Sequence, residues 1–151
     1  MPLRSSLRKS FVDAISATVF AAAIGGCGSD HRAAAPAHGF GPVYATVIGP
    51  RCLPCHATDV GAIDGHLDMS TEQQAYANLV GVKASGVSCG MSGLTRVVAG
   101  SAQTSLLFGK VESPLAMTAA FCGDTMPDDG TTLTRTDVTL IQNWIDDGAN
   151  R

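Results

Sequence analysis

Residues 52–56 of the chain read Cys-Leu-Pro-Cys-His. This C-x-x-C-H spacing is the attachment signature of a c-type haem. Two thiols that add to the two vinyl groups of one porphyrin must lie about one helical turn apart, and the adjacent histidine can then donate an imidazole nitrogen to the iron. The motif therefore predicts one haem c, attached covalently to Cys52 and Cys55, with His56 as the proximal iron ligand.

Two other interpretations of the motif stay open. A C-x-x-C pair also occurs in thioredoxin-like dithiols and as half of a zinc site. A thioredoxin-like protein would place the motif after a strand in a β-α-β context, and no such pattern precedes Cys52.

The N-terminus has the pattern of an export signal. Residues 4–9 include three basic side chains, and residues 14–24 form an apolar run that is short for a membrane span. The stretch 24–27 reads Ile-Gly-Gly-Cys and resembles the lipobox of bacterial lipoproteins, whose cysteine is acylated after cleavage. We therefore expect a signal peptide over residues 1–27 and lipidation of Cys27.

Export has consequences for location. Gly28 stands where an aspartate commonly retains lipoproteins at the inner membrane, so anchoring in the outer membrane, facing the periplasm, is favoured. An ordinary secretory peptide with an unmodified cysteine is the alternative. Either route places the mature chain outside the cytoplasm.

Two cysteines remain once Cys27, Cys52 and Cys55 are assigned. Because an exported protein meets an oxidising environment, Cys89 and Cys122 are predicted to form a disulfide. Two unpaired thiols are the alternative, since sequence does not fix their separation.

The rest of the chain divides into a tether and one small domain. Residues 28–41 are rich in Ala, Gly, His and Pro without apolar periodicity, which predicts a flexible tether with solvated histidines. Residues 42–151 have the length of one small domain, expected to be monomeric. Without residues 1–27 the formal charge falls from −3 to about −5, which argues against nucleic acid and for cationic partners.

The domain is predicted to be all-α with long loops. Apolar residues recur at helical spacing in four segments, within residues 42–50, 70–81, 102–111 and 135–147. Gly49-Pro50 is expected to end the first helix, and Thr134 to cap the last. Few stretches alternate, and no hairpin turn lies between apolar runs.

A haem iron with a saturated coordination shell needs a second axial ligand besides His56. The methionines that could supply it in the domain are Met69, Met91, Met117 and Met126. Met126 is favoured because Pro127 restricts its backbone to an extended conformation and stiffens the polar stretch 123–130. His66 would give a second imidazole instead.

These motifs together resemble a class I-type cytochrome c domain of the small, lipoprotein-anchored bacterial kind. The resemblance covers most of residues 42–151 and is based on the haem motif after an N-terminal helix, Met126-Pro127 in a late loop, the segment 98–107, and Leu140-Ile141-x-x-Trp144-Ile145 in a final helix. The long middle segment with its two cysteines departs from the most compact members.

The resemblance implies a cytochrome c-like small helical domain with long loops around one covalent haem. It implies that the first and last helices meet, with Phe40 or Val43 against Trp144 or Ile145. The second imidazole nitrogen of His56 should donate to a backbone carbonyl, which in such domains lies in the loop after the motif. Arg96 and Arg51 are candidate donors to the haem propionates.

The expected function is one-electron transfer to redox partner proteins, without catalysis by the chain itself. His56 and Met126 would occupy both axial positions of the iron, and no second haem motif or nucleotide-binding loop is present. The alternatives are a haem enzyme or small-ligand sensor with an open iron site, and a secreted thiol–disulfide oxidoreductase that uses Cys52 and Cys55.

Overall fold

The computed structural model describes residues 38–57, 60–116 and 122–151. Contacts divide the chain into two units, Met1–Arg32 and Ala33–Arg151, and all the described residues belong to the second. The predicted signal peptide, Cys27, Met117 and the tether up to residue 37 lie outside the described residues.

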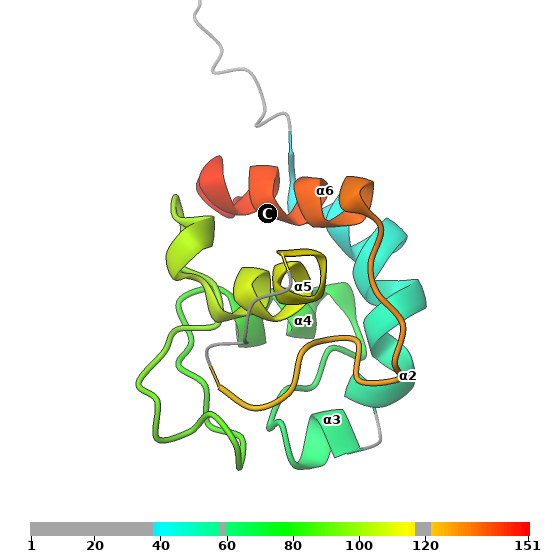
Figure 1. Ribbon diagram of the computed structural model, residues 1–151. Coiled ribbons are helices and arrows are strands. Elements are labelled where there is room, and N and C mark those ends of the chain that lie inside the picture. The colour runs from blue at the N-terminus through cyan, green and yellow to red at the C-terminus, as the bar shows by residue number, and fades with distance from the viewer. Residues whose placement is uncertain (1–37, 58–59, 117–121) are drawn as a thin grey trace, which may run out of the picture. The chain divides into compact units, whose positions relative to one another are not determined.

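The described part of the chain is helical (Figure 1). Its elements are α1 (Phe40–Val43), the π-helix η1 (Tyr44–Cys52), α2 (Leu53–His56), α3 (Val60–Ile63), α4 (Glu72–Leu79), the short 3₁₀ helix η2 (Ala102–Thr104), α5 (Leu106–Ala116) and α6 (Arg135–Asp146). Over these residues there is no strand, only the isolated bridges Val80–Val97 and Lys83–Thr95. The predicted all-α class is confirmed. None of these helices combines the length and apolar character that a membrane span requires.

The first helical stretch does not end at Gly49-Pro50, and that prediction is wrong. The chain stays helical through α1, η1 and α2, from Phe40 to His56. The backbone N–H of Leu53 donates to the carbonyl of Ile48, an i to i+5 bond that spans the glycine and the proline. The wider turn of a π-helix accommodates a residue that has no N–H to donate. The C-x-x-C-H motif therefore lies at the end of a continuous helical stretch.

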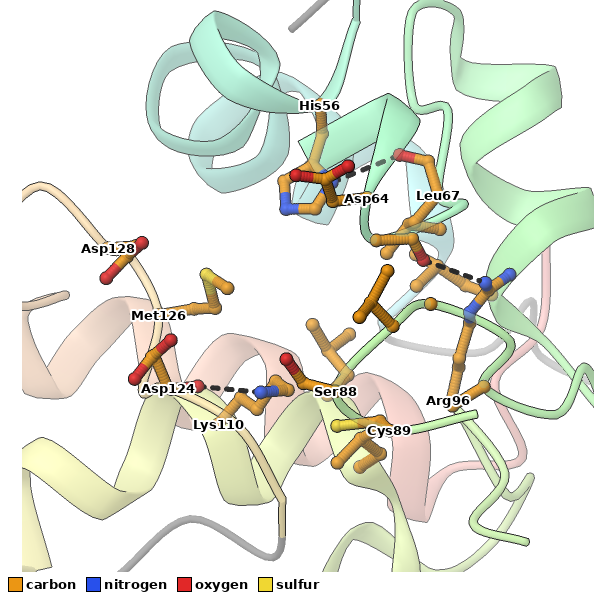
Figure 2. A pocket seen from close by; sticks show the side chains of 17 residues that line it. His56, Asp64, Leu67, Ser88, Cys89, Arg96, Lys110, Asp124, Met126 and Asp128 are labelled. Atoms are coloured by element: carbon orange, nitrogen blue, oxygen red, sulfur yellow. Dashed lines mark hydrogen bonds between the residues drawn. The ribbon is translucent and has the colours of Figure 1, made fainter. Parts of the chain in front are cut away.

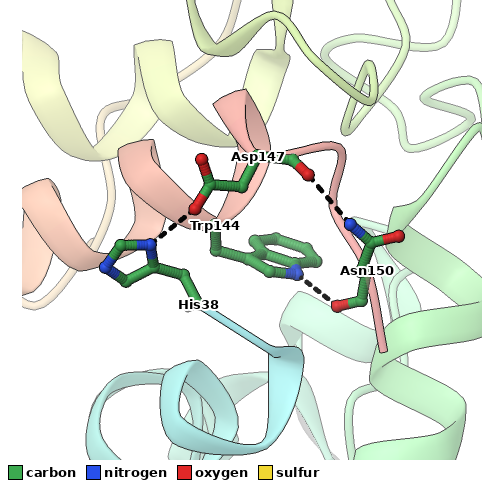
Figure 3. Close-up of polar contacts among 4 residues, drawn as sticks. All are labelled: His38, Trp144, Asp147 and Asn150. Atoms are coloured by element: carbon green, nitrogen blue, oxygen red, sulfur yellow. Dashed lines mark hydrogen bonds and ion pairs between the residues drawn. The ribbon is translucent and has the colours of Figure 1, made fainter. Parts of the chain in front are cut away.

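The packed region begins at Phe40, two residues before the predicted domain start at Pro42. Phe40 is fully buried, and its ring lies 5.0 Å from that of Trp144 on α6. The expected contact between the first and last helices is therefore present. His38 was predicted to be solvated, but its Nδ1 lies 2.6 Å from a carboxylate oxygen of Asp147 (Figure 3). The end of the predicted tether is thus part of the folded domain.

The two ends of the described domain are joined at α6. The backbone N–H of Phe40 donates to the carbonyl of Asn150 at 3.1 Å. The indole N–H of Trp144 donates to the same oxygen at 2.8 Å (Figure 3). The hydroxyl of Tyr76 donates to the carbonyl of Ala149 at 3.1 Å. These bonds satisfy the carbonyls that follow the last helix, which would otherwise need water.

Helix α6 begins as the sequence predicts, with Thr134 at its N-cap, and the structure shows a complete capping box. Thr134 Oγ1 accepts from the backbone N–H of Asp137, whose carboxylate accepts from the N–H of Thr134. Substitution Thr134→Ala is expected to lower the free energy of unfolding by about 1 kcal/mol, because the backbone N–H of Asp137 loses its acceptor, Thr134 Oγ1. Thr136→Ala, an exposed change in the same helix, is the control and should leave stability within about 0.5 kcal/mol in urea unfolding. Equal effects of the two changes would contradict a stabilising role for the cap.

Candidate functional site

A cavity of about 440 Å³ lies beside the end of the first helical stretch. Its size falls within the range of about 300–1,000 Å³ that is usual for ligand pockets. Leucines supply much of the apolar wall, and charged groups lie among them. The lining includes His56, Leu67, Cys89, Arg96, Lys110 and Met126 (Figure 2). The cavity brings together segments that are up to about 70 residues apart in the chain.

His56 is buried and enters the cavity from α2 (Figure 2). Its Nδ1 lies 3.1 Å from the carbonyl oxygen of Leu67, in the segment between α3 and α4. A carbonyl only accepts, so Nδ1 carries the proton, and in a neutral imidazole the lone pair is then on Nε2. The prediction that His56 donates to a carbonyl in the loop after the motif is confirmed, and the acceptor is now identified.

Met126 lines the same cavity from the loop that precedes α6 (Figure 2). Of the other candidate ligands in the described ranges, Met69 is buried in the main core, Met91 is fully exposed, and His66 is exposed. The cavity therefore brings His56 together with Met126 and with none of the other three.

Lys110 of α5 positions the loop that contains Met126. Its carbonyl accepts from the N–H of Met126 at 2.9 Å, and its ammonium donates to the carbonyls of Cys122 at 2.8 Å and Asp124 at 2.6 Å. Burial lowers the pKa of Lys110, while the Asp124 and Asp128 carboxylates act in the opposite direction. Sequence reasoning missed Lys110 because its partners are backbone oxygens, which leave no side-chain pattern.

Cys89 and Cys122 form the predicted disulfide, with their Cα atoms 5.5 Å apart. The bridge connects a cavity wall, to which Cys89 contributes, to the start of the Met126 loop. It packs with Ala84, Leu94 and Leu106 in a small apolar cluster separate from the main core. The disulfide and the Lys110 ammonium together hold the loop at Cys122 and Asp124, shortly before Met126.

The two cysteines of the motif lie outside the cavity lining. Cys52 is partly buried against the main core, Cys55 is exposed, and neither forms a disulfide. Burial raises the pKa of the Cys52 thiol to about 11, a shift that Arg51 opposes and Cys55 reinforces. At neutral pH Cys52 is therefore a protonated thiol, which is a weak nucleophile.

Arg96 is a buried cation at the cavity wall, only 6% exposed. Its guanidinium donates to the carbonyls of Gly65, His66 and Asn78 and to the hydroxyl of Ser85. Over the described residues no carboxylate lies within ion-pair distance of it. Burial without an anionic partner lowers the pKa of Arg96. Arg51, by contrast, is exposed and bonds to Thr131 and Thr132.

Comparison of the chain with family models, with curated proteins and with solved structures finds no match. Within the described ranges, no group of three or more His, Cys, Asp or Glu side chains is arranged to hold a metal ion.

Proposed function

We propose that this chain is an exported one-electron carrier with one covalent haem c, ligated by His56 and Met126, in a cytochrome c-like domain. One observation supports this most strongly. The histidine of the C-x-x-C-H motif lines a cavity together with Met126, and a carbonyl accepts from its Nδ1. That hydrogen bond puts the imidazole lone pair on Nε2, the nitrogen that can coordinate a metal.

The residues at the cavity fit a haem in their chemistry. When bound, the group would supply an iron that exchanges a single electron. An imidazole and a thioether are a common axial pair for such iron, and the thioether raises the reduction potential. Leu79, Leu106 and Leu107 give the cavity an apolar wall, and the Arg96 guanidinium is a candidate partner for a carboxylate. Cys52 and Cys55, on the same helical stretch as His56, would form the covalent links.

The alternative functions receive less support. A haem enzyme or ligand sensor needs an open iron site, whereas Met126 lies in the same cavity as His56. A thiol–disulfide oxidoreductase needs a cysteine whose pKa is lowered, whereas burial raises that of Cys52.

The expected partner is a redox protein with a basic surface. Asp64, Asp124 and Asp128 line the cavity and are exposed, so its mouth is acidic. Such a mouth attracts cationic surfaces through long-range electrostatics. A lipidated Cys27 would tether this domain in the cell envelope, with the outer membrane favoured over the inner.

Optical spectra of the oxidised and reduced protein test this proposal. Protein made with haem-attachment machinery should show a covalent haem and, when oxidised, the absorption band of an iron–thioether bond. Met126→Ala should keep the haem, lose that band completely, and allow carbon monoxide to bind the reduced iron at neutral pH.

Met91→Ala is the matched control, because Met91 is fully exposed and outside the cavity. Its spectra should equal those of the wild type. A wild-type protein with haem but without the thioether band would exclude Met126 as the ligand. A wild-type protein without haem would overturn the whole proposal.

A further inference from the structure

Five consecutive carbonyl groups, those of residues 65–69, each accept a hydrogen bond from a side chain elsewhere in the domain. We name this stretch the carbonyl segment. The donors are Arg96 to Gly65 at 3.3 Å and to His66 at 2.7 Å, His56 to Leu67 at 3.1 Å, Asn78 to Asp68 at 2.8 Å, and Tyr44 to Met69 at 3.2 Å. Loop carbonyls more often bond to water or to the backbone, so this arrangement restricts the segment strongly.

The carbonyl segment needs such support because of its backbone. His66 has φ of 47°, in the left-handed region that residues with a Cβ seldom occupy. The shortest of the five bonds, from Arg96 Nη2, is to the carbonyl of this residue. The next carbonyl along the chain, that of Leu67, is the acceptor for His56. A change at His66 would therefore move the acceptor.

Arg96 and Asn78 support the segment on both sides of Leu67. Arg96 donates to Gly65 and His66 before it, and the Asn78 side chain donates to Asp68 after it. The two residues are also joined, since Arg96 Nη1 donates to the Asn78 carbonyl at 2.9 Å. A planar guanidinium can donate in several fixed directions at once, which an ammonium group cannot reproduce.

We propose that Arg96 and Asn78 are positioning residues for His56. They fix the carbonyl segment so that the Leu67 oxygen faces Nδ1, and they act without contact to the reacting atoms. The inference rests on the proposed function for its redox consequence. A strong bond from Nδ1 raises the basicity of the imidazole and so favours the oxidised iron, whereas a weakened bond favours the reduced iron.

The test uses full-length protein made with haem-attachment machinery, as wild type, Arg96→Lys and Asn78→Ala. Arg96→Lys keeps the charge but loses the guanidinium geometry, and Asn78→Ala changes no charge. In both variants the His56 Nδ1 proton, followed by NMR, should exchange with solvent about five- to tenfold faster. The ratio of reduced to oxidised protein at a fixed ambient potential should rise by up to about tenfold, equivalent to about 59 mV.

Arg135→Lys is the matched control, because Arg135 is an exposed cation at the start of α6 and lies outside the cavity lining. It should leave both readouts at wild-type values. If Arg96→Lys does not fold, Asn78→Ala alone tests the inference. It removes only the side-chain hydrogen bond to Asp68, and because alanine is a good helix former, α4 should still form. Lower stability of the variants with both readouts unchanged would overturn the inference. A wild type without haem would contradict the proposed function, while proton exchange at His56 would still test the positioning.

Discussion

Protein in which Cys52 and Cys55 are both replaced by alanine is expected to contain no covalently attached haem. Each thioether link needs one of these sulfurs, and no other described cysteine is free, because Cys89 and Cys122 are bonded to each other. The wild type should keep its haem through denaturation and acid extraction, whereas the double variant should release all of it. Intact-protein mass would show the difference directly.

The matched control removes two cysteines from a different place. Cys89→Ala with Cys122→Ala should be less stable by roughly 3–4 kcal/mol, the value expected for a closed loop of 33 residues, yet should keep its covalent haem. If the Cys52/Cys55 variant still had a haem-bearing mass, the motif would not be the attachment site.

Replacement of Trp144 by alanine is expected to lower the free energy of unfolding by about 3–5 kcal/mol. Trp144 is fully buried, packs against Phe40, and donates its indole N–H to the Asn150 carbonyl. The change leaves a large cavity between α1 and α6 and removes the indole N–H that donates to the Asn150 carbonyl. Since a domain is stable by only about 5–15 kcal/mol, the folded fraction would fall sharply in mild urea.

Two further variants separate the sources of this loss. Trp144→Phe keeps an aromatic ring against Phe40 but loses the N–H, so it should cost less than the alanine change. Thr139→Ala, an exposed position on the same helix, should change stability by less than about 0.5 kcal/mol. A loss below about 1 kcal/mol for Trp144→Ala would show that the contact between α1 and α6 contributes little.

Helices α4, α5 and α6 could be predicted because their signals are local. Thr134 and Asp137 lie three residues apart and form the same capping box in almost any context. The predicted end of the first helix was wrong for a related reason. By local rules Gly49-Pro50 ends an α-helix, but in the structure a π-helix continues through both residues. The start of the domain was misplaced because the burial of Phe40 depends on Trp144, about a hundred residues away.

The candidate site was predictable where a side chain is recognised by its type. The motif identified His56, and Pro127 drew attention to Met126; both line the cavity. Arg96 and Lys110 could be seen in the sequence only as cations. Their partners are backbone oxygens of Gly65, His66, Cys122 and Asp124, and a backbone oxygen has the same chemistry at every position. Only the fold shows which of these oxygens lie within reach.

The hydrogen bond between Phe40 and Asn150 holds the two ends of the described domain side by side. His38, the first described residue, bonds to Asp147 at the end of α6, and Asn150 follows the same helix. Among the described residues, neither α1 nor α6 contributes to the cavity wall. A fusion made at residue 38 or at residue 151 would therefore be joined to elements that do not line the cavity of His56 and Met126.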